Sequence, residues 1–428
     1  MNAKRCARGL TGSVGIIGVL CLAGCGPWPQ LFQKEEKLMV DPARAYIDAQ
    51  ATLLQAAEDK DPVTRANAME ALAGTLGAEA GAVFVQALDE QNPLVRFAAA
   101  MAIGDSKYKP ALDRLLTMAR DKKGEPDKRV FCAVIYALHV LGNDEYAGQL
   151  GDLLFDSERE VRMDAAMAMG RMGEPTATGP LKTVLSGEQD EGVRLQIRES
   201  LARLGDEGSA QVMEAYTKGF YLDLRLAAIP ALADIGTRRA AIALRSLTDE
   251  RHPARIRVLA AGELARLGQG DPADYDLCMA ALRNPKKVLD ESNLRTKRLV
   301  DSDVDSLRRL AAIAVGWMGR DLAVNVLHPM LKSARGGDRV AAALSILRLL
   351  KAYRPMAPAA RKPVVLPTTA PAGAKPTTAP AKPAPTQSGC HGMATASPAT
   401  AGPTSRARTT PAAIPARPPA TPTPVASR

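Results

Sequence analysis

The 428-residue chain has few of the side chains from which enzymes build catalytic pockets. Aromatic residues make up 4% of it, and it contains four histidines. It lacks the glycine-rich loop of a nucleotide site, the cysteine spacing of a zinc site and the Gly-x-Ser-x-Gly motif of a serine hydrolase. We therefore expect no catalytic residue, no metal site and no cofactor.

Acidic residues are missing from both ends of the chain, which explains its net charge of +10. Residues 1–24 contain three basic residues and residues 354–428 contain nine, with no Asp or Glu in either segment. The segment between them carries a net charge of −2. A body this close to neutral offers no broad basic face to a phosphate backbone, so we expect no nucleic-acid partner.

No apolar run reaches the ~20 residues that a membrane-spanning helix needs. The run over residues 9–22 follows three basic residues, as in a signal peptide. It ends in LAGC, which resembles the lipobox of bacterial lipoproteins. The resemblance implies cleavage before Cys25 and diacylation of its sulfur, so that the lipid holds the protein on a membrane. An ordinary secretory signal is the alternative.

These features predict an extracytoplasmic protein of the bacterial cell envelope. Gly26 follows the lipobox where an Asp would signal retention, which favours the outer membrane in a cell with two membranes. Residues 1–24 are then the signal peptide and residues 25–40 a tether.

One sequence pattern recurs along the middle of the chain, with an arginine, several small residues and a closing glycine. It reads RMDAAMAMGRMG from Arg162, RLQIRESLARLG from Arg194 and RVLAAGELARLG from Arg257. Most copies lie 31 to 33 residues apart, and one step is 51. Apolar residues fall at helical spacing, and no window alternates as a strand does. The pattern predicts an all-α solenoid of about nine helix pairs over residues 41–352, with an insertion at 284–306.

This pattern resembles HEAT repeats, specifically the HEAT-like type named for bilin lyases. The resemblance implies an α-α superhelix whose concave face binds a partner. The His-Glu pairs of the HEAT-like iron hydroxylases are missing. We therefore expect a non-catalytic, membrane-anchored scaffold for a protein partner. The alternatives are a bilin-lyase-like enzyme or chaperone, and a structural envelope protein that acts through its basic tail.

The arginine that opens each copy is expected to be structural, because it recurs at the same point of every unit. It would pair with acids in the turn of its own or the next unit, such as Glu158, Glu160, Asp190 or Asp223. The arginines of this ladder are Arg65, Arg96, Arg162, Arg194, Arg225, Arg257, Arg308 and Arg339.

Nine residues after seven of the ladder arginines, near the expected end of that helix, arginine and tryptophan are frequent. These residue types are favoured in binding hot spots, so we expect them to grip acidic groups of the partner. The alternative is that cations in the last helical turn complement the helix dipole. The candidate binding residues are Arg171, Arg203, Arg266, Trp317 and Arg348, with Asp105 and Asp234 at the two other positions.

The insertion contains DSDVDS, whose alternate carboxylates at residues 301, 303 and 305 are similar to the start of a calcium loop. The glycine and glutamate that such a loop needs at its sixth and twelfth positions are absent. We therefore expect these acids to begin a helix. Cys132 and Cys278 are several repeats apart, which predicts two small core residues and no disulfide.

The last segment, residues 353–428, is expected to be disordered. From residue 354 onward, 17 of 75 residues are proline and none is aromatic. Its cations suggest an anionic envelope polymer as a partner, and a plain solubilising tail is the alternative. Within it, Cys390, His391 and Met393 are soft ligands of the kind that hold copper, although three ligands are a weak signal.

Overall fold

A computed structural model describes residues 37–120, 125–292 and 300–354. This part of the chain contains 19 α-helices and no strand, which confirms the predicted all-α class. Cys25, the rest of the predicted leader and tether up to residue 36, and the tail with Cys390, His391 and Met393 lie outside the described residues.

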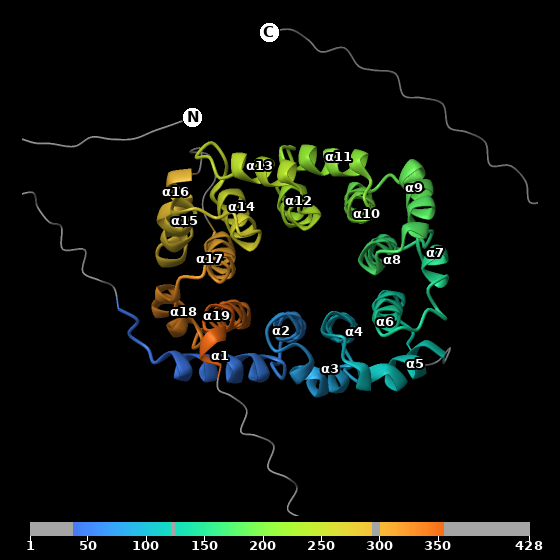
Figure 1. The fold of residues 1–428 in the computed structure, drawn as a ribbon, viewed down its shortest axis with the longest axis horizontal. Helices are drawn as coiled ribbons and strands as arrows, with labels where there is room; N and C mark the ends of the chain where they lie inside the picture. The colour runs from blue at the N-terminus through green and yellow to red at the C-terminus, as the bar shows by residue number, and fades with distance from the viewer. Residues whose placement is uncertain (1–36, 121–124, 293–299, 355–428) are drawn as a thin grey trace, which may run out of the picture. The chain divides into compact units, whose positions relative to one another are not determined.

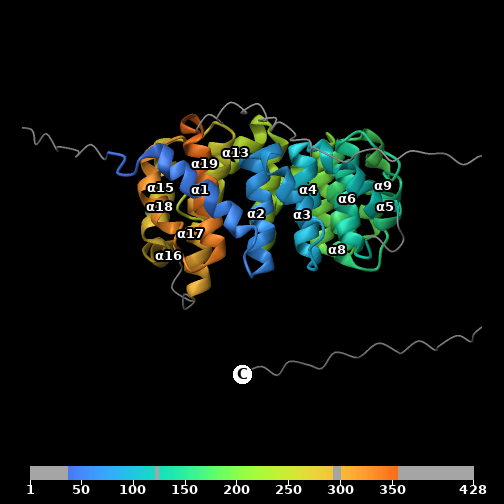
Figure 2. The same cartoon turned by 90° about the horizontal axis from the view of Figure 1, so that it is seen from below.

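The helices form an outer and an inner layer, and the inner helices α2 and α4 run along the axis of the assembly (Figures 1 and 2). The inner layer holds α2 (Pro62–Thr75), α4 (Pro93–Ser106), α6 (Lys128–Val140), α8 (Arg159–Met172), α10 (Glu191–Arg203), α12 (Leu222–Ile235), α14 (Ala254–Arg266), α17 (Asp301–Val315) and α19 (Gly336–Leu349). The outer layer holds α1 (Pro42–Ala56), α3 (Gly81–Ala87), α5 (Leu112–Arg120), α7 (Gln149–Leu153), α9 (Thr178–Gly187), α11 (Glu207–Thr217), α13 (Arg238–Ser246), α15 (Pro272–Arg283), α16 (Pro285–Ser292) and α18 (Val324–Met330).

Short polar and glycine signals set the ends of the inner helices. The Asp190 carboxylate caps α10 by accepting from the backbone N–H groups of Gly192 (2.9 Å) and Val193 (3.0 Å). At the other end, Gly173 and Gly205 have φ angles of 77° and 92°, which glycine adopts without strain. These local signals explain why the units end where the sequence pattern places them.

Small residues bring neighbouring inner helices close together. A Cβ atom added to Gly170 would lie 2.6 Å from Ser200 Oγ on the next inner helix, so only glycine fits. The Ser200 hydroxyl donates to the Ala166 carbonyl (2.7 Å). Ser345 repeats this bond to the Ala312 carbonyl (2.7 Å), on the other side of the assembly.

Several ladder arginines join their unit to the next one. Glu90 illustrates the contact, since its backbone oxygen accepts from Arg96 Nη1 (2.9 Å) within one unit and its carboxylate accepts from Arg65 Nη2 (3.0 Å) of the preceding unit. Glu188 does the same, with Arg194 Nη1 on its backbone oxygen (3.1 Å) and Arg162 Nε on its carboxylate (2.7 Å). The acid lies six residues before the ladder arginine of its own unit.

The solenoid closes into a ring, because its last unit uses the first as its next neighbour (Figure 1). Asp59 lies six residues before Arg65 and accepts from Arg65 Nη1 at its backbone oxygen (2.6 Å). Its carboxylate accepts from Arg339 Nη2 of α19 (2.5 Å). We call the contacts of α1 and α2 with α18 and α19 the seam. The sequence predicted the repeat and a concave face, but it did not predict the closure.

Further contacts across the seam are of the kind found inside the array. A Cβ atom added to Gly336 would overlap Thr64, so these two helices approach as closely as α8 and α10 do. His328 Nε2 lies 3.1 Å from an Asp48 carboxylate oxygen. One cluster of buried apolar residues continues from α1 through the seam to α19, while α10 to α14 contribute a second cluster.

The ladder contact changes between α11 and α17. Arg225 bonds to the Thr217 carbonyl (2.9 Å) and approaches His252 Nδ1 (3.2 Å), while Arg257 bonds to the Thr248 carbonyl (3.2 Å). Arg308 lies 3.9 Å from Asp305 of its own helix. Asp190 and Glu160 were expected from the sequence to pair with ladder arginines. Their carboxylates instead lie near Arg159, which is not a ladder arginine.

The insertion at 284–306 adds α16 to the outer layer and contributes the first turns of α17. Its acids lie at the start of α17, where Asp303 is 3.9 Å from Arg255 and Asp305 is 2.7 Å from Arg335. In the described part of the chain, no three His, Cys, Asp or Glu side chains come together in a way that could hold a metal ion.

Arg339 and Asp59 allow a test of the closed ring, if each is changed to Ala alone and both together. Charged hydrogen bonds with little exposure contribute about 1.5–3 kcal/mol. If the seam forms in solution, the two losses of unfolding free energy are non-additive by about 1–2 kcal/mol. The measurement is urea unfolding followed by far-ultraviolet circular dichroism.

Arg162 and Glu188 form the matched pair inside the array. Both pairs are largely buried, with side-chain exposures of 22% and 18% at the seam and 17% and 7% inside. We expect similar coupling in both. Coupling in the internal pair together with additive effects at the seam would mean that the ring is open in solution.

Candidate binding surface inside the ring

The predicted binding residues all lie at the edge of the ring where the inner helices end, which we call the C-terminal edge. Arg171, Arg203, Arg266 and Arg348 each occupy the last turn of their helix. Trp317 follows two residues after the end of α17. At this edge the cations also complement the carbonyl ends of the helix dipoles.

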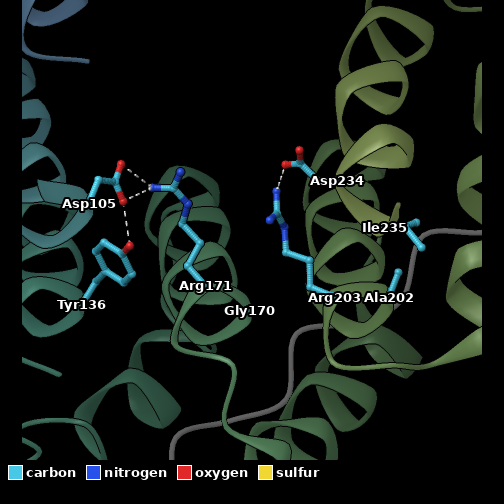
Figure 3. Close-up of a pocket in the computed structure, with 8 residues that line it drawn as sticks. All are labelled: Asp105, Tyr136, Gly170, Arg171, Ala202, Arg203, Asp234 and Ile235. Carbon is cyan, nitrogen blue, oxygen red and sulfur yellow. Dashed lines mark hydrogen bonds and ion pairs between the residues drawn. The ribbon is translucent and has the colours of Figure 1, made fainter. Parts of the chain in front are cut away.

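Two of these arginines line a pocket of about 400 Å³ on the inner surface (Figure 3). Arg171 Nη1 lies 3.3 Å from both carboxylate oxygens of Asp105, and its guanidinium stands over the Tyr136 ring at 5.5 Å. The Tyr136 hydroxyl donates to Asp105 (2.6 Å). Burial, and then the bond to Asp105, raise the pKa of Tyr136.

Asp234 joins Arg203 to a third arginine, Arg266, at the same edge. Its carboxylate bonds to Arg203 of α10 and to Arg266 Nη2 of α14 (2.5 Å). Each arginine also has a carboxylate on its own helix, Glu199 for Arg203 (2.9 Å) and Glu263 for Arg266 (2.6 Å). Burial lowers the pKa of Arg203, but Asp234 and Glu199 outweigh that effect and hold the pKa above its ordinary value.

A second pocket of about 620 Å³ lies across the seam, with walls from α2, α14, α17 and α19. We call it the seam pocket. One of its charged groups is Arg348, whose guanidinium lies over the Trp317 ring at 4.0 Å. Nε and Nη1 of Arg348 are buried, and neither has a hydrogen-bond partner among the described residues. Burial lowers the pKa of Arg348 to about 10.

The two pockets are suited to binding charged groups. The ionisable groups of the seam pocket are three carboxylates and three guanidinium groups. In the first pocket each arginine already bonds to a carboxylate of the chain, so an anionic guest must share or exchange that bond. Arg348 has no such bond and offers its charge directly.

Sequence reasoning named the positions of Asp105 and Asp234 but not their role. Both lie at the point of the repeat where four other units have arginine. Opposite charges at the same repeat position were the sequence signal for ion pairs between units. Asp105 and Arg171 are 66 residues apart, so only the curvature of the ring brings them together.

The opposite edge of the ring carries apolar side chains that the sequence pattern did not single out. Phe220 is 94% exposed and stacks edge-to-face on Tyr221, with ring centroids 5.6 Å apart. Phe155, in the loop before α8, is 66% exposed. Their position just before inner helices gives the ring a second surface with contact potential.

The cysteines and helices of the described segments add two observations. Cys132 and Cys278 are free and fully buried, as predicted. Burial also raises the pKa of both thiols. None of the described helices has the length and apolar character to cross a membrane.

The pattern that defines HEAT repeats matches residues 50–130, 123–202 and 149–221 of this chain. No curated protein matches the sequence. Among solved structures, human deoxyhypusine hydroxylase in complex with glycerol is 20% identical over 72% of this chain and 99% of that one, with a TM-score of 0.32. The complex of CpcE and CpcF of phycocyanin lyase from Nostoc sp. PCC7120 is 18% identical over 62% and 100%, with a TM-score of 0.36. At these scores neither likeness carries an argument about activity.

Replacing Arg348 with Met tests whether this arginine is kept at a cost to stability. Because its pKa is lowered to about 10, the folded state disfavours the charged form at every pH below that value, and the cost falls only as the pH rises through it. We expect the free energy of unfolding of Arg348→Met at pH 7 to be unchanged or higher by up to about 2 kcal/mol. Urea unfolding measures it.

Arg339→Met is the control, because this arginine bonds to the Ser333 carbonyl (2.9 Å) and to Asp59. We expect it to lose about 2–3 kcal/mol. An equal loss in both variants would show that Arg348 is as structural as the ladder.

Proposed function

We propose that the chain is a non-catalytic scaffold, anchored to a membrane of the cell envelope, that binds a protein partner along the inner surface of its ring. Residues 50–221 match the pattern of HEAT repeats. The observation that carries the proposal is the gathering of Arg171, Arg203, Arg266, Arg348 and Trp317 at the C-terminal edge. Repeat arrays of this kind bind partners along their concave face.

The carboxylates at this edge hold the arginines in place for a partner. Asp105 and Asp234 bond to the arginines of three different helices. Side chains fixed in this way lose less conformational entropy when an acidic partner group arrives. Since closure removes the open side of the concave face, the partner reaches these residues through an edge of the ring.

The membrane anchor is proposed from the LAGC sequence and from the place where the chain enters the ring. Lys37 and Met39 bond to Asn325 near the start of α18, and Arg354 pairs with Glu79 just after α2. Both contacts are at the C-terminal edge. Residues 25–36 span at most about 40 Å, so a lipid on Cys25 would keep the binding edge within that distance of the bilayer.

The basic tail, residues 353–428, is proposed to lie on an anionic polymer of the envelope. It has nine Lys or Arg from residue 354 onward and no acid, while the body between leader and tail is near neutral. Its attraction to such a polymer would weaken as salt increases.

Neutralising three edge arginines tests partner binding. We expect in-cell crosslinking of a tagged Arg171→Gln, Arg203→Gln, Arg266→Gln variant to lose the protein partner that the wild-type chain captures. Glutamine is preferable to glutamate here, because a new carboxylate would face Asp105 or Asp234. Mass spectrometry identifies the partner, and circular dichroism checks that the variant is folded.

Three outer cations give a matched control, because each is also in an ion pair. Arg120 lies 3.8 Å from Glu145, Lys182 lies 2.6 Å from Asp206, and Arg239 lies 2.9 Å from Glu214. Changing Arg120, Lys182 and Arg239 to Gln should leave capture intact. Equal crosslinks in all three proteins, clustered on residues 353–428, would transfer the binding function from the ring to the tail.

The anchor is tested with Cys25→Ala. We expect this variant to lose metabolic labelling by palmitate, because the acylated sulfur is gone, and to accumulate with its leader uncleaved. Labelling of the wild-type chain is the positive control. A variant that is processed at the same position as the wild type would point to an ordinary secretory signal.

A further inference from the structure

The seam pocket combines an apolar wall with one buried cation. Leu310 and Ile313 of α17 and Val340 and Leu344 of α19 line it, together with Ala71 of α2. Ile313 and Trp317 are 37% and 39% exposed. An apolar ligand would cover them and remove their apolar surface from water, which is favourable.

Arg348 is unusual among the buried polar groups of the described residues. It contributes two nitrogen atoms without a hydrogen-bond partner, while every other residue with such atoms contributes one. Glu70 and Glu263 act on it through space, but Glu263 bonds to Arg266 (2.6 Å) and Glu70 is exposed. Nε and Nη1 of Arg348 have almost no accessible surface of their own, and the guanidinium as a whole has no bonded anion, so an anion that reached it would compensate its charge.

We infer that the seam pocket binds a carboxylate carried on an apolar chain, with the carboxylate at Arg348 and the chain along α17 and α19. Guanidinium groups bind carboxylates in a planar, two-bonded geometry. The stacked indole of Trp317 holds the guanidinium plane in one orientation. A volume of about 620 Å³ is in the range of small-molecule sites.

The pocket also connects the ligand to ring closure. Its walls come from the first inner helix, α2, and from the last two, α17 and α19. A ligand that contacts both sides binds the closed ring and not the open one. It therefore stabilises closure by an amount that follows from its concentration and affinity.

Arg348 and Trp317 also belong to the binding edge of the proposed function, and the inference goes beyond that function by giving these two residues a small ligand. The carboxylate has two plausible sources of the same chemistry, a fatty acid or the C-terminal end of an apolar peptide. Binding is measured on the purified protein without any partner, so its failure leaves partner capture untouched, and the reverse also holds.

Trp317 provides the readout, because the chain has only two tryptophans and the other, Trp28, can be removed as Trp28→Phe. We expect dodecanoate, kept below its micelle concentration, to change Trp317 emission saturably. Dodecanol, with the same chain and no charge, should bind at least about 10-fold more weakly, which corresponds to the loss of about 1.4 kcal/mol. Dodecanoate should also raise the unfolding temperature.

Two variants separate the parts of the site. In the Trp28→Phe background, Arg348→Met should weaken dodecanoate at least about 10-fold and leave dodecanol unchanged, while Ile313→Ser should weaken both. Arg171→Gln together with Arg203→Gln should have no effect. Ile313 is partly exposed, so its replacement leaves a folded protein if Arg348→Met does not fold.

The peptide arm identifies the source of the carboxylate. A short apolar peptide with a free C-terminus is compared with its amidated form. Stronger binding of the free peptide than of dodecanoate assigns the site to a chain end, and the opposite order assigns it to a fatty acid. The inference is overturned if neither dodecanoate nor the free peptide binds. It is also overturned if Arg348→Met and its parent bind dodecanoate equally well.

Discussion

The ring depends on one repeated contact, in which a guanidinium group binds the loop of its own unit and an acid of a neighbouring unit. At Glu90 and Glu188 the contact sets the spacing of consecutive helix pairs. At Asp59 the same contact joins the last unit to the first. Open arrays need special end units to cover their exposed cores. Here each end of the array covers the other, and the apolar core runs through the seam.

The sequence was sufficient to predict the helices, because its signals are local. The period, the helical spacing of apolar residues and the glycines such as Gly173 and Gly205 each act within a few residues. Closure could not be read in the same way. It is the sum of small rotations between successive units, and no single unit encodes it. An acid six residues before a ladder arginine is present in the sequence at positions 59, 90 and 188. Only the distances in the structure show that each of these acids bonds to the arginine of the preceding unit.

For the inner surface, the sequence predicted where the arginines lie but not which residues they pair with. The arginines at the helix ends were recognised from their place in the repeat, and the structure puts them at one edge. Their partners come from other units. Asp105 and Arg171 are separated by a whole intervening unit and meet because the wall curves. The stack of Arg348 on Trp317 likewise joins α19 to the end of α17. Contacts of this kind follow from tertiary geometry, which the period of the sequence does not predict.

Closure also limits how such a protein can evolve. An open array can lengthen or shorten by duplicating or losing a unit at an end. In this chain an added unit would move Asp59 away from Arg339, so the number of units is fixed by geometry, as the number of strands is in a closed β-barrel. The additional residues of the 51-residue step instead form α16 in the outer layer. Variation in this architecture is therefore confined to the outer layer, where new segments can be added while the number of inner helices stays the same.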